Sequence, residues 1–143
     1  MALKGIQAYK KGSLKQDLST ADPHKITLML MQGALEKIAY AKGAMERREY
    51  ESKAQHVSKA IAIIVSLRDT LDMDIGGELA ENLFSLYDYM VTRLNDGNIQ
   101  NNEKILDEVI QLMLPIKNAW MQIPESAKQE AYEMKKQQSV ASV

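Results

Sequence analysis

Residues 79 to 94 read LAENLFSLYDYMVTRL, and this stretch decides the fold class. Its apolar residues recur every three or four positions, at Leu79, Leu83, Leu86, Met90 and Leu94. This spacing is typical of a helix that turns one face toward other helices. Turn-forming residues lie on both sides, Gly76-Gly77 before the stretch and Asn95-Asp96-Gly97-Asn98 after it. The pattern therefore predicts one helix bounded by two turns.

Three further stretches show the same spacing. The first covers residues 22 to 48 and begins with Asp22-Pro23, where an aspartate caps free N–H groups and a proline fits the first helical position. The others cover residues 50 to 71 and 101 to 120. Four helices of similar length joined by short turns run antiparallel to their neighbours. We therefore expect an all-α fold, an antiparallel up-down-up-down four-helix bundle over residues 22–123.

Two residues inside the expected helices break the rules of helix composition. Pro115 removes a backbone hydrogen bond and clashes with the carbonyl of Gln111, so the fourth helix is expected to bend near residues 111–115. Gly33 costs about 1 kcal/mol relative to alanine in a helix, which indicates a close approach there by a sister helix or a bound peptide. Outside the bundle, we expect a mobile, mostly irregular segment over residues 1–21 and a tail with a short helix over residues 124–143.

The composition limits the class of protein. A chain of 143 residues fits one domain, and the absence of cysteine excludes disulfides and thiolate chemistry and favours a reducing, cytoplasmic compartment. The formal net charge of -1 gives no basic footprint for nucleic acid, so we expect a protein partner instead. No signal peptide is expected. The longest uncharged stretch of the first helix, residues 26–35, is shorter than the roughly twenty residues of a membrane span, so we expect no stable membrane insertion.

Motifs for catalysis and metal binding are missing from the sequence. No glycine-rich run ends in Gly-Lys-Ser or Gly-Lys-Thr, and no paired Glu-x-x-His sequences occur for a di-iron site. The segment that begins at Asp72 starts like a calcium loop, but Gly76 occupies its fifth position and Leu83 stands where a bidentate glutamate is needed. We therefore expect no metal, no cofactor and no enzymatic activity.

His56 supports one alternative function. The order His56-x-x-Lys59 on a helix of a four-helix bundle resembles histidine phosphotransfer domains, in which an exposed imidazole carries a phosphoryl group and the lysine offsets its charge. That family generally has glycine after the lysine, whereas this chain has Ala60. Phosphotransfer through His56 is kept as the alternative hypothesis.

The helices carry more apolar residues than a bundle seam needs, which is about three positions in seven. The surplus forms a second line beside the leucines of the third helix and continues on the fourth: Ala80, Phe84, Tyr87, Val91, Ile105 and Leu112. Two interpretations stay open at this point. The residues belong either to a thick core or to an exposed groove that takes an amphipathic helix from a partner.

A longer match indicates the family. The segment LDMDIGGELAENLFSLYDYM, residues 71 to 90, closely resembles the signature of FliS, the flagellin-specific export chaperone family, and the resemblance continues through Arg93-Leu94 and Asn98-Ile99. The segment STADPHKITLMLMQGAL, residues 19 to 35, is similar to the family's T-A-S-P start and L-Y-D-G-A stretch, with Met31-Gln32 in place of Tyr-Asp. Ile6-Gln7-Ala8-Tyr9 resembles the family's N-terminal element.

The resemblance implies a cytoplasmic helical bundle that binds the C-terminal segment of flagellin, prevents its premature polymerisation and delivers it to FlhA, a component of the flagellar export gate. Ile6 and Tyr9, three apart, would share one face of a helical turn and cover apolar surface as a movable plug when no client is bound. Self-association stays open. We expect flagellin contacts at Ile6, Tyr9, Phe84, Tyr87, Val91, Ile105 and Leu112.

Overall fold

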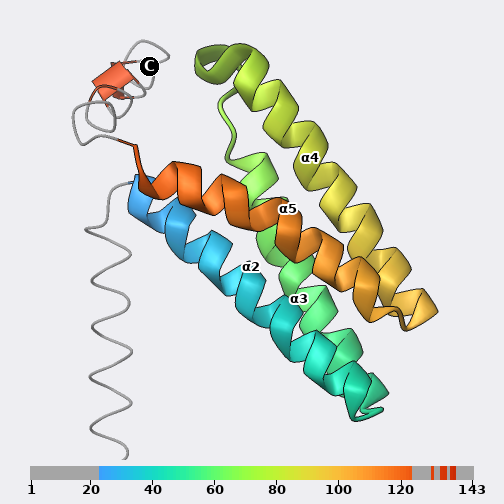
Figure 1. Cartoon of the computed structure of the whole chain (residues 1–143). Helices are drawn as coiled ribbons and strands as arrows, with labels where there is room; N and C mark the ends of the chain where they lie inside the picture. Colours follow the sequence, from blue (N-terminus) through green and yellow to red (C-terminus); the bar gives the residue numbers. More distant parts are fainter. Residues whose placement is uncertain (1–22, 124–129, 131–132, 135, 138–143) are drawn as a thin grey trace, which may run out of the picture. The chain divides into compact units, whose positions relative to one another are not determined.

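The computed structural model describes residues 23–123 and five residues of the tail, Glu130, Glu133, Met134, Lys136 and Gln137. The described residues contain no strand and four helices, namely α2 (Pro23–Glu46), α3 (Tyr50–Asp69), α4 (Met73–Gln100) and α5 (Glu103–Met121). Consecutive helices reverse direction within residues 28–122, which form one compact unit (Figure 1). The predicted all-α four-helix bundle is therefore confirmed. None of the helices in the described ranges combines the length and apolar character needed to cross a bilayer.

All four helices contribute to a single core. Its largest fully buried side chains come from every helix: Met31 and Ile38 of α2, Ile64 and Leu67 of α3, Tyr87, Met90 and Leu94 of α4, and Leu106 and Met113 of α5. Burial of each such side chain contributes about 1.5–3 kcal/mol relative to its exposure to water. The three-four spacing of the sequence predicted the inward positions of Met90 and Leu94 correctly, whereas the burial of Tyr87 was not predicted.

The first turn ends α2 close to the predicted position. The chain leaves the helix at Arg48, whose φ of 58° lies in the left-handed region. The N–H of Arg48 donates to the carbonyl of Met45, and the N–H of Glu49 donates to that of Ala44. These two bonds satisfy carbonyls that the end of a helix leaves free, in the motif where glycine is the usual residue.

The polar run at residues 95–98 is not a turn, so the predicted end of the third helix there is wrong. The helix continues to Gln100, and the chain turns at Asn101, whose φ is 55°. Gly97 serves packing instead, because a Cβ built on it would stand 2.5 Å from Leu106 Cδ1 of α5. Lys53 of α3 closes this end of α4, since its buried ammonium donates to the carbonyl of Asn98 and to Asn101 Oδ1.

The start of α4 carries a kink at Gly77, where φ is 52° and ψ is −129°. A side chain is strained in this conformation, so the predicted turn role of Gly76-Gly77 holds at Gly77, although the helix begins earlier, at Met73. Asp72 caps this first turn by accepting from the N–H groups of Asp74 and Ile75.

The buried face of α4 differs from the predicted one. Its core residues are Ala80, Tyr87, Met90, Leu94 and Gly97. Residues 80, 87 and 94 are seven apart, so they form a heptad seam, and Leu79 lies about 100° away from it around the helix. Leu79 is consequently 66% exposed, and its predicted place in the core is wrong.

The structure bears differently on the predictions made for Pro115 and Gly33. α5 remains one helix through Pro115, and the expected bend there stays a prediction. At Gly33 a Cβ would lie 3.5 Å from Ile63 Cδ1, an ordinary contact distance, so the neighbouring helix does not require glycine. The expectations for residues 1–21 lie outside the described residues. The short tail helix stays a prediction, although the five described tail residues are helical.

Candidate protein-binding surface

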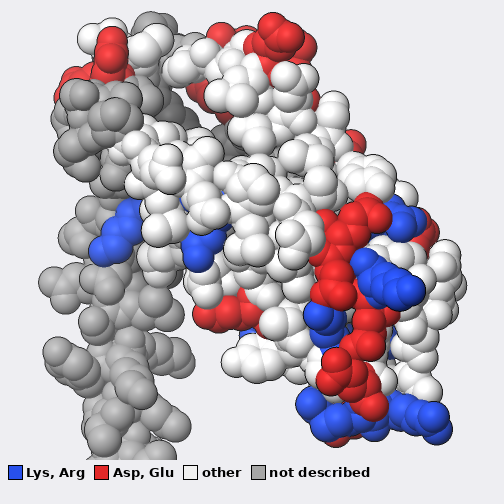
Figure 2. Space-filling view, in the orientation of Figure 1, with Lys and Arg blue, Asp and Glu red and all other residues white. Residues whose placement is uncertain are grey.

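Charge is distributed unevenly over residues 28–122. In Figure 2 the charged side chains are densest toward the lower right of the visible face, acidic side chains also gather at the top, and the surface between them carries few. The sequence accounts for this, because Lys117 is the only charged residue of α5 after Glu108. The charged end holds ion pairs between helices, among them Lys42 with Asp107. A largely uncharged surface suits an apolar partner better than a highly charged one.

Several apolar side chains of α4 and α5 remain partly open to solvent. Leu79, Phe84, Leu114 and Met121 are exposed. Others pack against the core and keep part of their surface in water: Leu83, Leu86, Val91, Ile110, Leu112, Ile116 and Trp120. We refer to these eleven residues as the open apolar set. A separate surface hollow at the start of α3 is lined by Glu49, Tyr50, Glu51, Ser52 and Gln55.

The predicted second line on the third helix is divided by the structure. Phe84 is 37% exposed and Val91 is half-buried, as an accessible line requires. Ala80 and Tyr87 belong to the core instead, and Tyr87 is only 2% exposed. The reason is the heptad seam, which passes through residues 80 and 87. Burial also raises the pKa of the Tyr87 hydroxyl to about 12.

The two predicted flagellin contacts on the fourth helix, Ile105 and Leu112, differ in exposure. Ile105 is buried beside Gly97, where its Cγ2 atom would stand 3.2 Å from a Cβ at residue 97. Leu112 is half-buried and packs against the core with one side open. In the chain without a partner, Tyr87 and Ile105 therefore support the surface from beneath and do not line it. Ile6 and Tyr9 lie outside the described residues.

Phe84 is held by a neighbouring cation. The guanidinium carbon of Arg68 on α3 lies 5.5 Å from the centre of the Phe84 ring. Arg68 is fixed in turn, because its Nη1 donates to Asp88 Oδ1 at 2.6 Å and its Nε donates to Asp69 Oδ1 at 3.1 Å. The bond to Asp88 is the main cause that raises the pKa of Arg68, followed by the bond to Asp69. The ring therefore has a defined position while part of it faces solvent.

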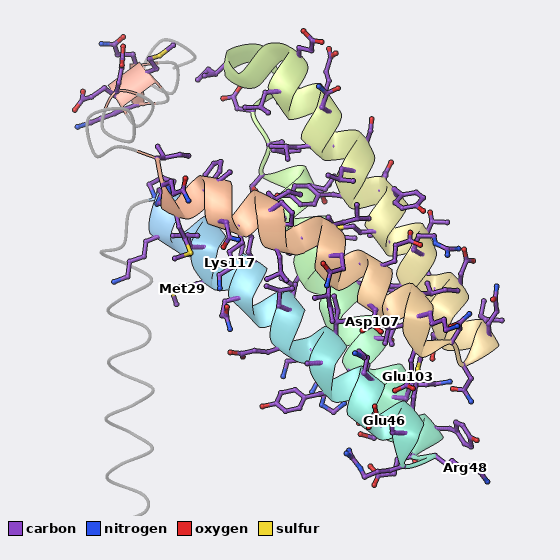
Figure 3. The ribbon with its side chains drawn as sticks, in the orientation of Figure 1. Met29, Glu46, Arg48, Glu103, Asp107 and Lys117 are labelled. Carbon is purple, nitrogen blue, oxygen red and sulfur yellow. The ribbon has the colours of Figure 1, made fainter. Side chains whose placement is uncertain are left out.

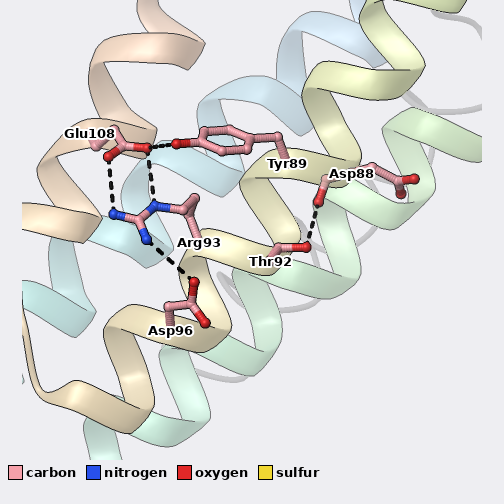
Figure 4. Close-up of polar contacts among 6 residues, drawn as sticks. All are labelled: Asp88, Tyr89, Thr92, Arg93, Asp96 and Glu108. Atoms are coloured by element: carbon pink, nitrogen blue, oxygen red, sulfur yellow. Dashed lines mark hydrogen bonds and ion pairs between the residues drawn. The ribbon is translucent and has the colours of Figure 1, made fainter.

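A polar clasp joins α4 to α5, and Figure 4 shows its contacts. Glu108 of α5 accepts a hydrogen bond from the Tyr89 hydroxyl at 2.5 Å and two from the Arg93 guanidinium, each at 3.2 Å. Arg93 also donates to Asp96. The bonds from Tyr89 and then Arg93 lower the pKa of Glu108, so this carboxylate stays ionised at neutral pH. The clasp fixes α4 near its middle.

Two carboxyl groups meet where α2 ends and α5 begins. Glu46 is the last residue of α2, and Figure 3 shows it beside Glu103 and Asp107 of α5. The neighbouring Glu46 carboxyl is the main cause that raises the pKa of Glu103, and burial acts in the same direction. Glu103 Oε1 is buried and has no hydrogen-bond partner among the described residues. The folded chain therefore favours the protonated form of Glu103 more than the unfolded chain does.

His56 lies in a separate environment on α3. Its Nδ1 lies 2.8 Å from the carbonyl oxygen of Ser52. Because a carbonyl oxygen only accepts, Nδ1–H donates a hydrogen bond to it. The Tyr40 ring of α2 stands 5.4 Å from the imidazole, measured between ring centres. Ala60, the residue after Lys59, is fully buried in the core. These contacts account for His56 as part of the seam between α2 and α3.

Several surface residues were not predicted to lie at the surface. Leu79, Leu114 and Met121 are exposed, and Arg68 holds Phe84 in place. The seven-residue spacing of the α4 seam would have assigned Leu79 to the outside. The same argument applies to Leu114, which follows the buried Met113 by one residue. The pairing of Arg68 with Asp88 spans twenty residues and leaves no local pattern.

Comparison with known proteins identifies the family of this chain. Residues 5–127 match the family model described as flagellar protein FliS. The chain is 46% identical over 119 residues to the flagellar secretion chaperone FliS of Vibrio cholerae, an alignment that covers 83% of this chain and 88% of that protein. It is 45% identical over 119 residues to FliSB of Pseudomonas aeruginosa, covering 83% and 94% of the two chains, and 39% identical over 129 residues to FliS of Salmonella typhimurium, covering 89% and 96%.

Proposed function

Because the chain belongs to the FliS family of flagellar proteins, we propose that it is a flagellar secretion chaperone that acts in the cytoplasm. Its client is the C-terminal segment of flagellin. The chaperone binds this segment before export, prevents its premature polymerisation and assists its delivery to FlhA in the flagellar export gate.

The open apolar set on α4 and α5 is the observation that carries the proposal. A partly exposed aromatic ring such as Phe84, held in place by Arg68, has the features of an interface anchor. The half-buried neighbours Val91 and Leu112 lie between core and solvent, so an incoming apolar helix can complete their burial. Phe84, Val91 and Leu112 are therefore the proposed contacts among the described residues, and Ile6 and Tyr9 are proposed for the N-terminal segment.

The physical chemistry suits a holding chaperone. Flagellin's terminal segments are disordered in the monomer and become helical in the filament. The apolar side chains of these segments must therefore be covered between synthesis and assembly. Binding to apolar surface covers them, and the entropy lost when the segment becomes ordered limits the net affinity. Limited affinity permits later release without nucleotide hydrolysis.

A binding titration with matched variants tests the proposal. Phe84→Ala is expected to weaken binding of the flagellin C-terminal segment by at least about tenfold, the loss of roughly 1.4 kcal/mol that an interface anchor exceeds. Tyr50→Ala is the control, because Tyr50 is an exposed aromatic residue at the start of α3, outside the open apolar set. His56→Ala is expected to bind as the unmodified protein does. Equal weakening by Phe84→Ala and Tyr50→Ala would show that Phe84 is not part of the binding site. Phosphoryl transfer to His56 without any flagellin binding would favour the phosphotransfer alternative.

A further inference from the structure

The two halves of α4 are attached to the bundle in different ways. Among the described residues, the polar side-chain contacts that join α4 to other helices all involve residues from Asp88 onward. They link Asp88 with Arg68, Tyr89 and Arg93 with Glu108, and Asn98 with Lys53. Residues 73–86 make no such hydrogen bond or ion pair with another helix in the described part of the chain. Their side chains reach other helices through apolar packing and through the cation–π contact between Phe84 and Arg68 of α3.

Apolar burial follows the same division. Residues 87–100 contribute four of the five buried residues of α4, namely Tyr87, Met90, Leu94 and Gly97. Residues 73–86 contribute only Ala80, whose side chain is a single methyl group. The same half exposes three large apolar side chains, those of Met73, Leu79 and Phe84. Since burial is the main stabilising term, the first half is the less stable half.

The backbone provides a break at the start of this half. Gly77 leaves helical geometry, so the turn before it, over residues 73–76, does not continue smoothly into the rest of α4. The local cap at Asp72 stabilises that turn alone. A helix that is interrupted near one end loses part of the cooperativity that resists fraying.

We infer that residues 73–84 open as a local unit while the clasp at Glu108 and the remainder of the bundle stay folded. Opening uncovers Ala80 and the inner side of Leu83 together with the core surface beneath them. This step would give a client helix access to apolar surface that the closed chain covers; that consequence rests on the proposed function, whereas the opening itself does not.

The absence of cysteine permits a direct test on the free protein. A thiol placed at a buried position reacts with a labelling reagent only when that position opens, so the rate reports the open population. Ala80→Cys reports on the first half of α4, and Ala60→Cys is the matched control, because Ala60 is a buried alanine in the middle of α3. We expect Ala80→Cys to react at least about tenfold faster than Ala60→Cys, with a weak dependence on denaturant that is typical of local opening.

Amide exchange of the unmodified chain gives an independent measurement that does not depend on either variant folding. Amides of residues 80–84 should exchange at least about tenfold faster than those of residues 90–94, after correction for intrinsic rates. Equal labelling rates with the same denaturant dependence, or equal exchange in the two halves of α4, would contradict local opening. Both measurements use the protein without flagellin, so a failed client titration leaves their result unaffected.

Discussion

The backbone of Gly97 in α4 lies so close to Leu106 in α5 that a Cβ at position 97 would stand 2.5 Å from Leu106 Cδ1. Gly97→Ala must therefore push the two helices apart or force Leu106 out of position, and we expect a loss of about 1–3 kcal/mol in the free energy of unfolding, as for other overpacked cores. Denaturant unfolding measures this loss.

Gly33→Ala is the matched control for that substitution, because the added methyl group meets Ile63 Cδ1 at an ordinary 3.5 Å. Alanine should stabilise α2 by up to about 1 kcal/mol through its better helix propensity. A loss of stability in Gly33→Ala as large as that in Gly97→Ala would show that packing between helices does not distinguish the two glycines.

The truncation of two aromatic residues on α4 should separate surface from core. Tyr87 is fully buried, so Tyr87→Ala should cost about 3–5 kcal/mol of unfolding free energy, the range found for large side chains in cores. Phe84 is partly exposed, so Phe84→Ala should cost less than about 3 kcal/mol and leave a folded protein at 25 °C. Thermal melting of both variants checks the difference, and a Phe84→Ala protein as unstable as Tyr87→Ala would assign Phe84 to the core.

The Glu46–Glu103 pair predicts a specific pH dependence. The folded-state pKa of Glu103 is raised, so the folded chain binds this proton more tightly than the unfolded chain does. The contribution to stability is complete below the ordinary glutamate pKa and is lost as the pH rises through the higher folded-state pKa. At neutral pH the two carboxylates repel each other, so Glu103→Gln should raise the melting temperature there and have little effect at acidic pH.

Melting curves between acidic and neutral pH measure this difference, with Glu51→Gln as the control, because Glu51 is an exposed carboxylate in the first turn of another helix. Glu108, whose pKa is lowered, should behave in the opposite way and lose its contribution only as the pH falls through that lowered value. If Glu103→Gln melts at the wild-type temperature at every pH, folding does not raise the pKa of Glu103.

The proposed plug around Ile6 and Tyr9 predicts an effect of the N-terminal segment on affinity. If this segment competes with flagellin for the same surface, deletion of residues 1–15 should tighten flagellin binding, or at least preserve it, while docking of the complex to FlhA weakens. Calorimetry with each partner measures both effects. Unchanged binding of flagellin and FlhA by Ile6→Ala with Tyr9→Ala would exclude the plug.

The helices could be predicted because their signals are local. The start at Pro23, the turn after Glu46 and the inner residues Met90 and Leu94 follow from capping, breakers and periodicity. Gly97 was misassigned to a turn because glycine has two uses, and only the position of Leu106 on another helix shows that this one serves close packing.

The candidate surface was harder to predict because two adjacent apolar lines on one helix look equivalent in the sequence. Which line faces the core depends on the rotation of α4, which the seam through Ala80, Tyr87 and Leu94 determines. Consequently Phe84 is accessible as expected, whereas Tyr87 is buried. Arg68, which holds Phe84, comes from a different helix and could not be paired with it by spacing.

Calorimetric titration of the full chain with flagellin, and with flagellin that lacks its C-terminal segment, tests whether this chain binds that segment. We predict one-to-one binding of intact flagellin at micromolar concentration or below, a negative heat-capacity change from apolar burial, and no binding of the truncated flagellin. Equal binding of intact and truncated flagellin, or no binding of either, would contradict it.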